Sequence, residues 1–163
     1  MDLIASEVMR RNVKSVPPEM SLPELERTFT DSGLGGFPVV DGTQVVGVVS
    51  RSDIVRQLYF EHSVAEQTSD YYRDAEGFHE LPLKTSREIA DRVGERMEQL
   101  TVRDVMHQGV FAVPPDQPLR SVAQTMTDQH IHRVLVTRDG ELLGIISTMD
   151  LVRLYANGRL RPG

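Results

Sequence analysis

The chain has 163 residues, of which 26% are charged and 39% hydrophobic, and its formal net charge is −6. This balance is typical of a folded globular protein and excludes a wholly disordered chain, while the negative charge disfavours binding to nucleic acid. The absence of cysteine excludes a disulfide framework and a cysteine-ligated zinc site. Apolar runs such as residues 45–49 are too short to cross a bilayer and the N-terminus lacks a basic signal-peptide start, so we expect a cytoplasmic protein with no membrane partner.

The sequence contains an internal repeat with a constant offset of 97 residues: residues 3–56 align with residues 100–153 without a gap. Turn-forming and polar residues agree outright between the copies, and the positions between them exchange one apolar residue for another. Halves of about 55 residues lie near the lower limit for independent folding. We therefore expect the two copies to bury apolar faces against each other.

The first repeat begins with a short predicted strand over residues 13–16. A helix follows at Ser21, whose hydroxyl can cap it while Glu24 completes a capping box. Its apolar face has helical spacing, with Leu22, Leu25 and Phe29.

Two β-branched strands are predicted next, over residues 37–40 and residues 45–49. The Asp41-Gly42 dipeptide between them is a hairpin signal, and Asp139-Gly140 provides the same signal in the second copy. A second helix is predicted over residues 52–59. Each repeat is therefore expected to have the order β-α-β-β-α.

An insert without a counterpart in the repeat occupies residues 61–99. Its first part, residues 61–83, has weak periodicity and is predicted to be a loop with short helical pieces that pack on another surface. A capping box at residues 85–88 predicts a helix over about residues 86–100. The apolar face of this helix consists of Ile89, Val93, Met97 and Leu100.

Both repeats end on a polar motif in which a strand stops at a serine and a carboxylate follows three residues later. The pairs are Ser50 with Asp53 and Ser147 with Asp150. One interpretation is structural, since this spacing forms a capping box that only satisfies backbone N–H groups. The other is functional: the helix N-terminus and the hydroxyl bind a phosphate, while the carboxylate accepts ribose hydroxyls.

The ordered features of each copy resemble those of a tandem CBS-domain protein, a Bateman module. Each has a V-x-x-V-P-P segment, a helix, a hairpin and a G-h-h-[ST]-x-x-D motif, and the resemblance covers residues 3–56 and residues 100–154. It implies an α/β (α+β) fold in which two β-α-β-β-α repeats pack about a pseudo-twofold axis. The implied domains are residues 1–60 and 100–157 as the repeats, 61–99 as the insert and 158–163 as a tail.

The resemblance also implies a ligand, because the clefts of this family bind AMP, ADP, ATP or S-adenosylmethionine. No cofactor is required, and the nucleotide acts as a regulatory ligand. Asp53 and Asp150 would bind ribose, and Ser50 and Ser147 would lie near phosphate. The residues implied to line the base are Val13, Val16, Val110 and Val113.

The copies differ before the first hairpin strand, where repeat two has His132-Arg133 and repeat one has Gly35-Gly36. By resemblance, the two cations would contact ligand phosphates, and an arginine can donate a fork of hydrogen bonds to phosphate. Exposed strand-edge residues without a ligand are the alternative. A weaker hypothesis is a metal site at His130-x-His132, with both imidazoles on one face of a strand. Our prediction for this chain is that it has no metal ligands.

The function that we predict is a non-enzymatic regulatory module with an adenine nucleotide as its ligand. The resemblance implies a homodimer, with the helix over residues 86–100 as a candidate contact, and a separate effector protein as a further partner. The alternative is a protein-protein interaction scaffold that binds no ligand. Among apolar residues, we expect Phe29, Phe37, Phe111 and Met126 in the core.

Overall fold

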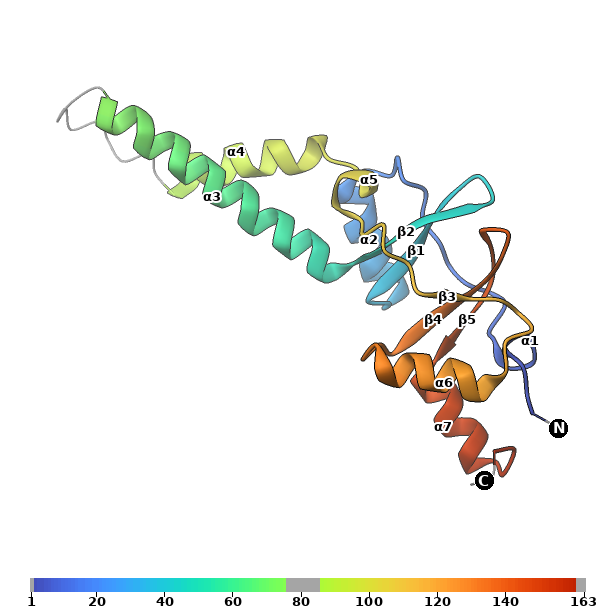
Figure 1. Cartoon of the computed structure of the whole chain (residues 1–163). Helices are drawn as coiled ribbons and strands as arrows, with labels where there is room; N and C mark the ends of the chain where they lie inside the picture. Colours follow the sequence, from blue (N-terminus) through green and yellow to red (C-terminus); the bar gives the residue numbers. More distant parts are fainter. Residues whose placement is uncertain (1, 76–85, 161–163) are drawn as a thin grey trace. The chain divides into compact units, whose positions relative to one another are not determined.

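The computed structural model describes residues 2–75 and 86–160, and this part of the chain holds seven helices and five strands (Figure 1). It divides into two compact units. The Asp150 unit comprises Met1–Ser15, Val40–Gly47 and Gln108–Gly163, and the Asp53 unit comprises Val16–Val39 and Val48–His107. The units therefore do not coincide with the two repeats, because each contains the first residues of the other repeat.

The strands form one hydrogen-bonded sheet in the order β1-β2-β5-β4-β3. In the Asp150 unit, β3 (Ala112–Val113) runs parallel to β4 (Arg133–Arg138), which is antiparallel to β5 (Glu141–Ser147). The turn between β4 and β5 has Asp139 at φ 51° and Gly140 at φ 79°, so both turn residues have the positive φ that a type I′ hairpin requires. The hairpin predicted at this dipeptide is confirmed.

Three helices complete the Asp150 unit: α1 (Ala5–Val8), α6 (Leu119–Asp128) and α7 (Thr148–Ala156). One buried apolar cluster joins them to the sheet, and it includes Ala5, Met9, Val122, Met126, Val136, Ile146 and Leu154. Because Ala5 and Met9 come from the start of the chain, the core of this unit is built from both repeats.

The Asp53 unit contains α2 (Leu22–Ser32), α3 (Arg51–Ala75), α4 (Ser86–Gln99) and α5 (Val102–Val105), with most of β1 (Gly36–Asp41) and the end of β2 (Gln44–Ser50). The predicted cap is confirmed, since the Glu24 N–H donates to Ser21 Oγ at 3.3 Å. Phe29 and Phe37 stack in the core with ring centroids 4.9 Å apart.

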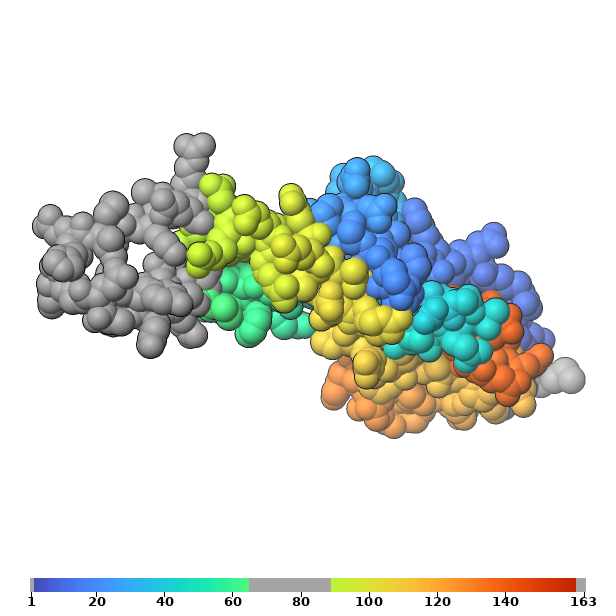
Figure 2. All heavy atoms as spheres, turned by 90° about the horizontal axis from the view of Figure 1, so that it is seen from above, coloured from blue at the N-terminus to red at the C-terminus, as the bar shows by residue number. Residues whose placement is uncertain are grey.

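The insert is more helical than the sequence predicted. The helix α3 continues to Ala75, so the prediction of a loop from residue 61 is wrong for residues 61–75. It lies beside α4 (Figures 1 and 2), and the buried Glu61 accepts from Gln57 at 2.9 Å and from Arg96 at 3.4 Å. The interhelical ion pair gives α3 a partner that no local pattern reveals. Residue 85, at which the predicted capping box begins, and the loop predicted over residues 76–83 lie outside the described residues.

Three further predictions need correction. The strand over residues 13–16 is reduced to a single parallel bridge between Val16 and Val39, because the chain turns at the following prolines. Phe111 is 47% exposed and is not a core residue, because it lies just before β3, a strand of two residues. The apolar face of α4 is less open than the sequence predicted, because Val93 and Leu100 are buried within its own unit while Ile89 and Met97 are half-buried.

Candidate functional site

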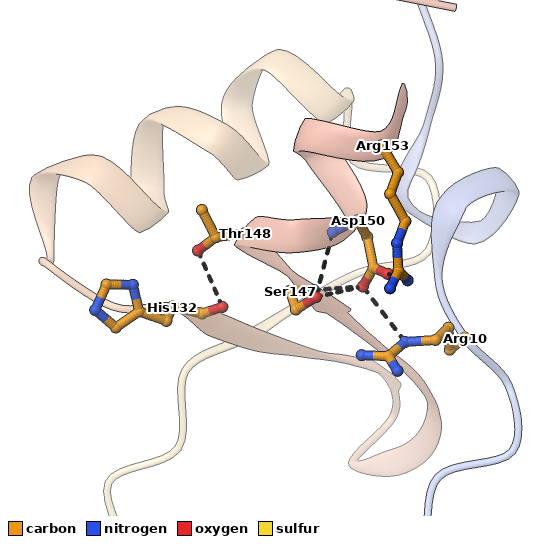
Figure 3. A network of polar contacts seen from close by, with 6 residues as sticks. All are labelled: Arg10, His132, Ser147, Thr148, Asp150 and Arg153. Atoms are coloured by element: carbon orange, nitrogen blue, oxygen red, sulfur yellow. Dashed lines mark hydrogen bonds and ion pairs between the residues drawn. The ribbon is translucent and has the colours of Figure 1, made fainter. Parts of the chain in front are cut away.

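In the Asp150 unit, the serine-carboxylate motif lies where β5 ends and α7 begins. The Ser147 N–H and Oγ donate to Asp150 Oδ2 at 2.8 and 2.7 Å, and the Asp150 N–H donates back to Ser147 Oγ at 3.3 Å (Figure 3). Both side chains are buried. The motif is therefore a complete capping box, as the structural interpretation predicted.

The copy in the Asp53 unit makes the same contacts to the carboxylate at the start of α3. The Ser50 N–H and Oγ donate to Asp53 Oδ2 at 2.7 and 3.1 Å, and Asp53 is only 3% exposed. In both copies the cap uses one carboxylate oxygen. The other oxygen, Oδ1, remains for a second role, so capping and ligand binding are compatible in one residue.

Two arginines flank the carboxylate of Asp150. Arg10 Nε lies 3.4 Å from Oδ2, and Arg153 Nη1 lies 3.7 Å from Oδ1. Their side chains are 58% and 67% exposed. Figure 3 shows the two terminal nitrogens of Arg10 turned away from the carboxylate, so this guanidinium still has donors for a further acceptor.

An arginine and a histidine flank the carboxylate of Asp53, and both use the same oxygen. Arg56 Nη1 lies 2.9 Å and His107 Nε2 lies 2.6 Å from Oδ1. The two nitrogens are 3.0 Å from each other. Oδ1 of Asp150 thus has one long contact, with Arg153, whereas Oδ1 of Asp53 has two short ones.

Arg10 and His107 occupy equivalent positions of the two repeats, and each lies in the leading segment of its repeat, residues 3–10 or residues 100–107. Arg10 exchanges backbone hydrogen bonds of 2.9 and 3.0 Å with Ile145. His107 exchanges two of 2.9 Å with Val48, the position equivalent to Ile145. Each leading segment therefore completes the motif of the other repeat.

Sequence reasoning missed Arg10, His107, Arg56 and Arg153 as members of the site. The 97-residue offset relates Arg10 to His107 and Arg56 to Arg153, which was a usable signal. It could not reveal that a leading segment pairs with the opposite repeat, because that exchange is a property of the tertiary fold.

His132 and Arg133, the two residues predicted to contact ligand phosphates, differ in their surroundings. The His132 carbonyl accepts from the Thr148 N–H at 3.0 Å and from its Oγ1 at 3.2 Å, while the imidazole points away from Asp150 (Figure 3). Arg133 is exposed and lies opposite Ser147 in the β4-β5 ladder. Arg133 is therefore the nearer of the two to the motif along the strand.

The four valines predicted to line the base of the ligand differ in burial. Val16 and Val113 are buried in the core, at the Val39 bridge and in β3. Val13 and Val110 are half-buried. Val13 lines a cavity of about 290 Å³ in the Asp150 unit together with Arg11, Ser15, Val40, Gly42, Thr43, Glu141 and Leu142.

The geometry assumed for a histidine metal site is wrong. His130 has φ 53° and both histidines precede β4, so they do not share the face of a strand. Within residues 2–75 and 86–160, no three His, Asp or Glu side chains come close enough together to hold a metal ion. No helix in this same part of the chain has the length and apolar character needed to span a membrane.

Comparison with known proteins decides the family. The family model described as CBS domain matches residues 5–59 and residues 102–157, which is more than half of the chain and coincides with the two repeats. The chain belongs to the CBS-domain family. The expected class of fold, a mixture of helices with a sheet in a tandem CBS arrangement, is confirmed.

A relative within the family is the uncharacterized protein MJ1426 of Methanocaldococcus jannaschii, with 30% identity over 92% of this chain and 89% of its own length. The chain covers only 42% of another relative, the uncharacterized protein MJ1225 of the same organism.

Two solved CBS structures have adenosine compounds in their descriptions. CBSX2 in complex with AMP has a TM-score of 0.67 and 20% identity, over 96% of this chain and 98% of that one. The CBS domain pair of protein MJ0100, in complex with 5′-methylthioadenosine and S-adenosyl-L-methionine, has a TM-score of 0.62 and 17% identity, over 97% and 99%. At these identities the similarity establishes a shared fold.

Proposed function

We propose that this protein is a non-enzymatic regulatory module that binds adenosine-containing nucleotides at its two serine-carboxylate motifs. The observation that carries the proposal is the repeated construction of one site: a buried carboxylate, fixed through one oxygen by a helix cap, with two nitrogen-bearing side chains beside it, at least one of them an arginine. The CBS pairs that are described as complexes with AMP or S-adenosylmethionine support this choice of ligand class.

Each residue of the Asp150 motif has a proposed role. Asp150 accepts the ribose hydroxyls through Oδ1, since Oδ2 already accepts the two hydrogen bonds of the cap. Ser147 and the N-terminus of α7 lie near a phosphate, where a hydroxyl and free N–H groups favour an anion. Arg133 and His132 supply positive charge, and Val13 and Val110 line the base. Ser50 and Asp53 have the equivalent roles in the other motif.

Equilibrium titration with AMP, ADP, ATP and S-adenosylmethionine tests the proposal. Binding of at least one of them, lost from one site in Asp150→Asn and from the other in Asp53→Asn, would support it. Asp104→Asn is a matched control, because Asp104 accepts from the Thr101 N–H at 2.8 Å and its Oγ1 at 3.2 Å in a similar cap outside the motifs. Absence of binding by all four compounds at millimolar concentration would contradict the proposal.

A ligand-free interaction scaffold is the second candidate. The serine-to-carboxylate hydrogen bonds at the two helix starts favour it, because they give both carboxylates a structural role without a ligand. The titration separates the two functions. A scaffold binds none of the four compounds, and its Asp150→Asn variant keeps every interaction of the wild type with its partners.

We propose that the module forms a homodimer and that it signals to a separate effector protein. Both second helices expose apolar side chains at equivalent positions, Val55 and Leu58 on α3 and Val152 and Tyr155 on α7. We propose these side chains as candidate contacts beside the half-buried part of the α4 face. Sedimentation velocity should give a dimer for the wild type and a monomer for Val152→Glu. A wild type that is monomeric both at high concentration and after 100-fold dilution would exclude this contact. Regulation then requires the nucleotide to bind one assembly better than another.

A further inference from the structure

The two motifs differ at one equivalent position, which is an arginine beside Asp150 and a histidine beside Asp53. We propose that Arg10 and His107 are the residues that make the two sites unequal in ligand specificity. Arg10 gives the Asp150 site a preference for ligands with a phosphate, whereas His107 occupies the Asp53 carboxylate and must be displaced before a ribose can bind. This inference rests on the proposed nucleotide-binding function.

The geometry of Arg10 leaves it free to bind an anion while it remains on the carboxylate. Its Nε lies 3.4 Å from Asp150 Oδ2, and its terminal nitrogens face away from Asp150 (Figure 3). A guanidinium has five N–H donors, so contact with one carboxylate oxygen leaves several for phosphate oxygens. The side chain is 58% exposed and accessible to a ligand.

The charges around Asp150 lead to the same conclusion. Arg10 and Arg153 together exceed the single negative charge of the carboxylate. Arg153 is 3.7 Å from Oδ1, so this oxygen has a weak contact that a ribose hydroxyl can replace. A ligand that carries both a ribose and a phosphate satisfies the carboxylate and the surplus positive charge together.

The surroundings of Asp53 are different. Its Oδ1 is 2.6 Å from His107 Nε2 and 2.9 Å from Arg56 Nη1, while Oδ2 accepts from the Ser50 N–H and hydroxyl. The imidazole nitrogen that meets the carboxylate has at most one proton to donate, so it cannot bind a phosphate at the same time. A ribose at Asp53 must therefore break an existing hydrogen bond, and this cost lowers the affinity of the Asp53 site.

Exchange of the two residues tests the inference through the ratio of AMP affinity to adenosine affinity, which isolates the contribution of the phosphate. The wild type should bind AMP first at the Asp150 site, assigned by its loss in Asp150→Asn. In Arg10→His, the AMP affinity of this site should fall by about tenfold or more, because a charged hydrogen bond is lost. Its adenosine affinity should fall less, because the new imidazole beside Asp150 competes with the ribose of both compounds alike, so the ratio of AMP to adenosine affinity should fall. In His107→Ala, the Asp53 site should bind adenosine more tightly, since its carboxylate has one competitor fewer.

Arg138→His serves as the control. Arg138 is the last residue of β4, at the opposite end of the strand from Arg133, which pairs with Ser147. Its replacement by histidine changes the net charge as Arg10→His does and leaves the motif unaltered. An Arg10→His variant with the AMP-to-adenosine ratio of the control would overturn the role of Arg10, and unchanged adenosine binding at the Asp53 site in His107→Ala would overturn the role of His107. Either result leaves the proposed function intact if AMP still binds the wild type. Absence of AMP binding by the wild type overturns both.

Discussion

At the scale of single residues, Asp150 completes the capping box of α7, and we propose for it the second task of binding the ligand. Because the Ser147 N–H and hydroxyl both donate to Oδ2, an alanine at this position removes the carboxylate half of the capping box as well as the charge. We predict that Asp150→Ala lowers the free energy of unfolding by about 1 kcal/mol, the typical value of a lost helix cap. Thermal melting measures it.

The Asp150→Asn variant separates the two tasks, since its amide oxygen can still accept from Ser147 while the charge is gone. It should melt closer to the wild type than Asp150→Ala does and should lose nucleotide affinity equally. An asparagine variant that binds AMP as the wild type does would show that the negative charge has no role in binding.

Gly144 is a second position at which one residue determines local structure. A Cβ there would lie 2.6 Å from the Met9 sulfur and 2.8 Å from the Arg10 carbonyl oxygen, because the leading segment passes directly over β5. Gly144→Ala should destabilise the protein by about 1 to 3 kcal/mol through this overpacking.

Gly94 provides the matching control within the chain. It lies on the exposed part of α4, and no atom lies within 4 Å of the position that an alanine methyl group would occupy. Gly94→Ala should therefore raise stability by up to about 1 kcal/mol. Denaturant unfolding of both variants tests the pair, and equal shifts in the same direction would contradict it.

At the scale of elements, the insert is stabilised by packing between α3 and α4. Val93 on α4 is only 5% exposed. Val93→Ala should cost about 1 to 2 kcal/mol from lost burial, whereas Glu95→Ala on the exposed face should cost less than about 0.5 kcal/mol. Chemical denaturation followed by circular dichroism provides both values; similar costs would mean that the helices do not pack as described.

The elements that the sequence predicts correctly are those with strong local signals. The hairpin dipeptides, the Ser21 cap and the apolar stripe of α4 each specify a structure from neighbouring residues alone. Along α3, by contrast, Glu61 contacts Arg96, a residue 35 positions away that a local pattern does not include. The two-residue β3 and the single bridge at Val16 likewise depend on sheet partners, so local patterns misjudged them.

At the scale of the whole molecule, the exchange of leading segments governs both stability and the site. Ala5 is fully buried and Met9 nearly so in the core of the Asp150 unit, although both belong to repeat one. A fragment of residues 100–163 should therefore fail to fold cooperatively. Adding a peptide of residues 1–15 should not restore it fully, since residues 40–47 also belong to this unit. Cooperative melting of the fragment alone would contradict this expectation.

The same exchange explains why the site could be predicted only in part. The serine and carboxylate of each motif were found because they are neighbours in the sequence and form a cap. Arg10 and His107 were not, because each is positioned by backbone hydrogen bonds to a strand of the other repeat, at Ile145 and Val48.

A crystal structure of the protein with AMP is the most direct test of the central claim that the buried carboxylates are ribose receptors. We predict the ribose hydroxyls on Asp150 Oδ1 and the phosphate within hydrogen-bond distance of the terminal nitrogens of Arg10. If AMP at millimolar concentration leaves both carboxylates with only the contacts described above, or binds away from both motifs, the claim is wrong.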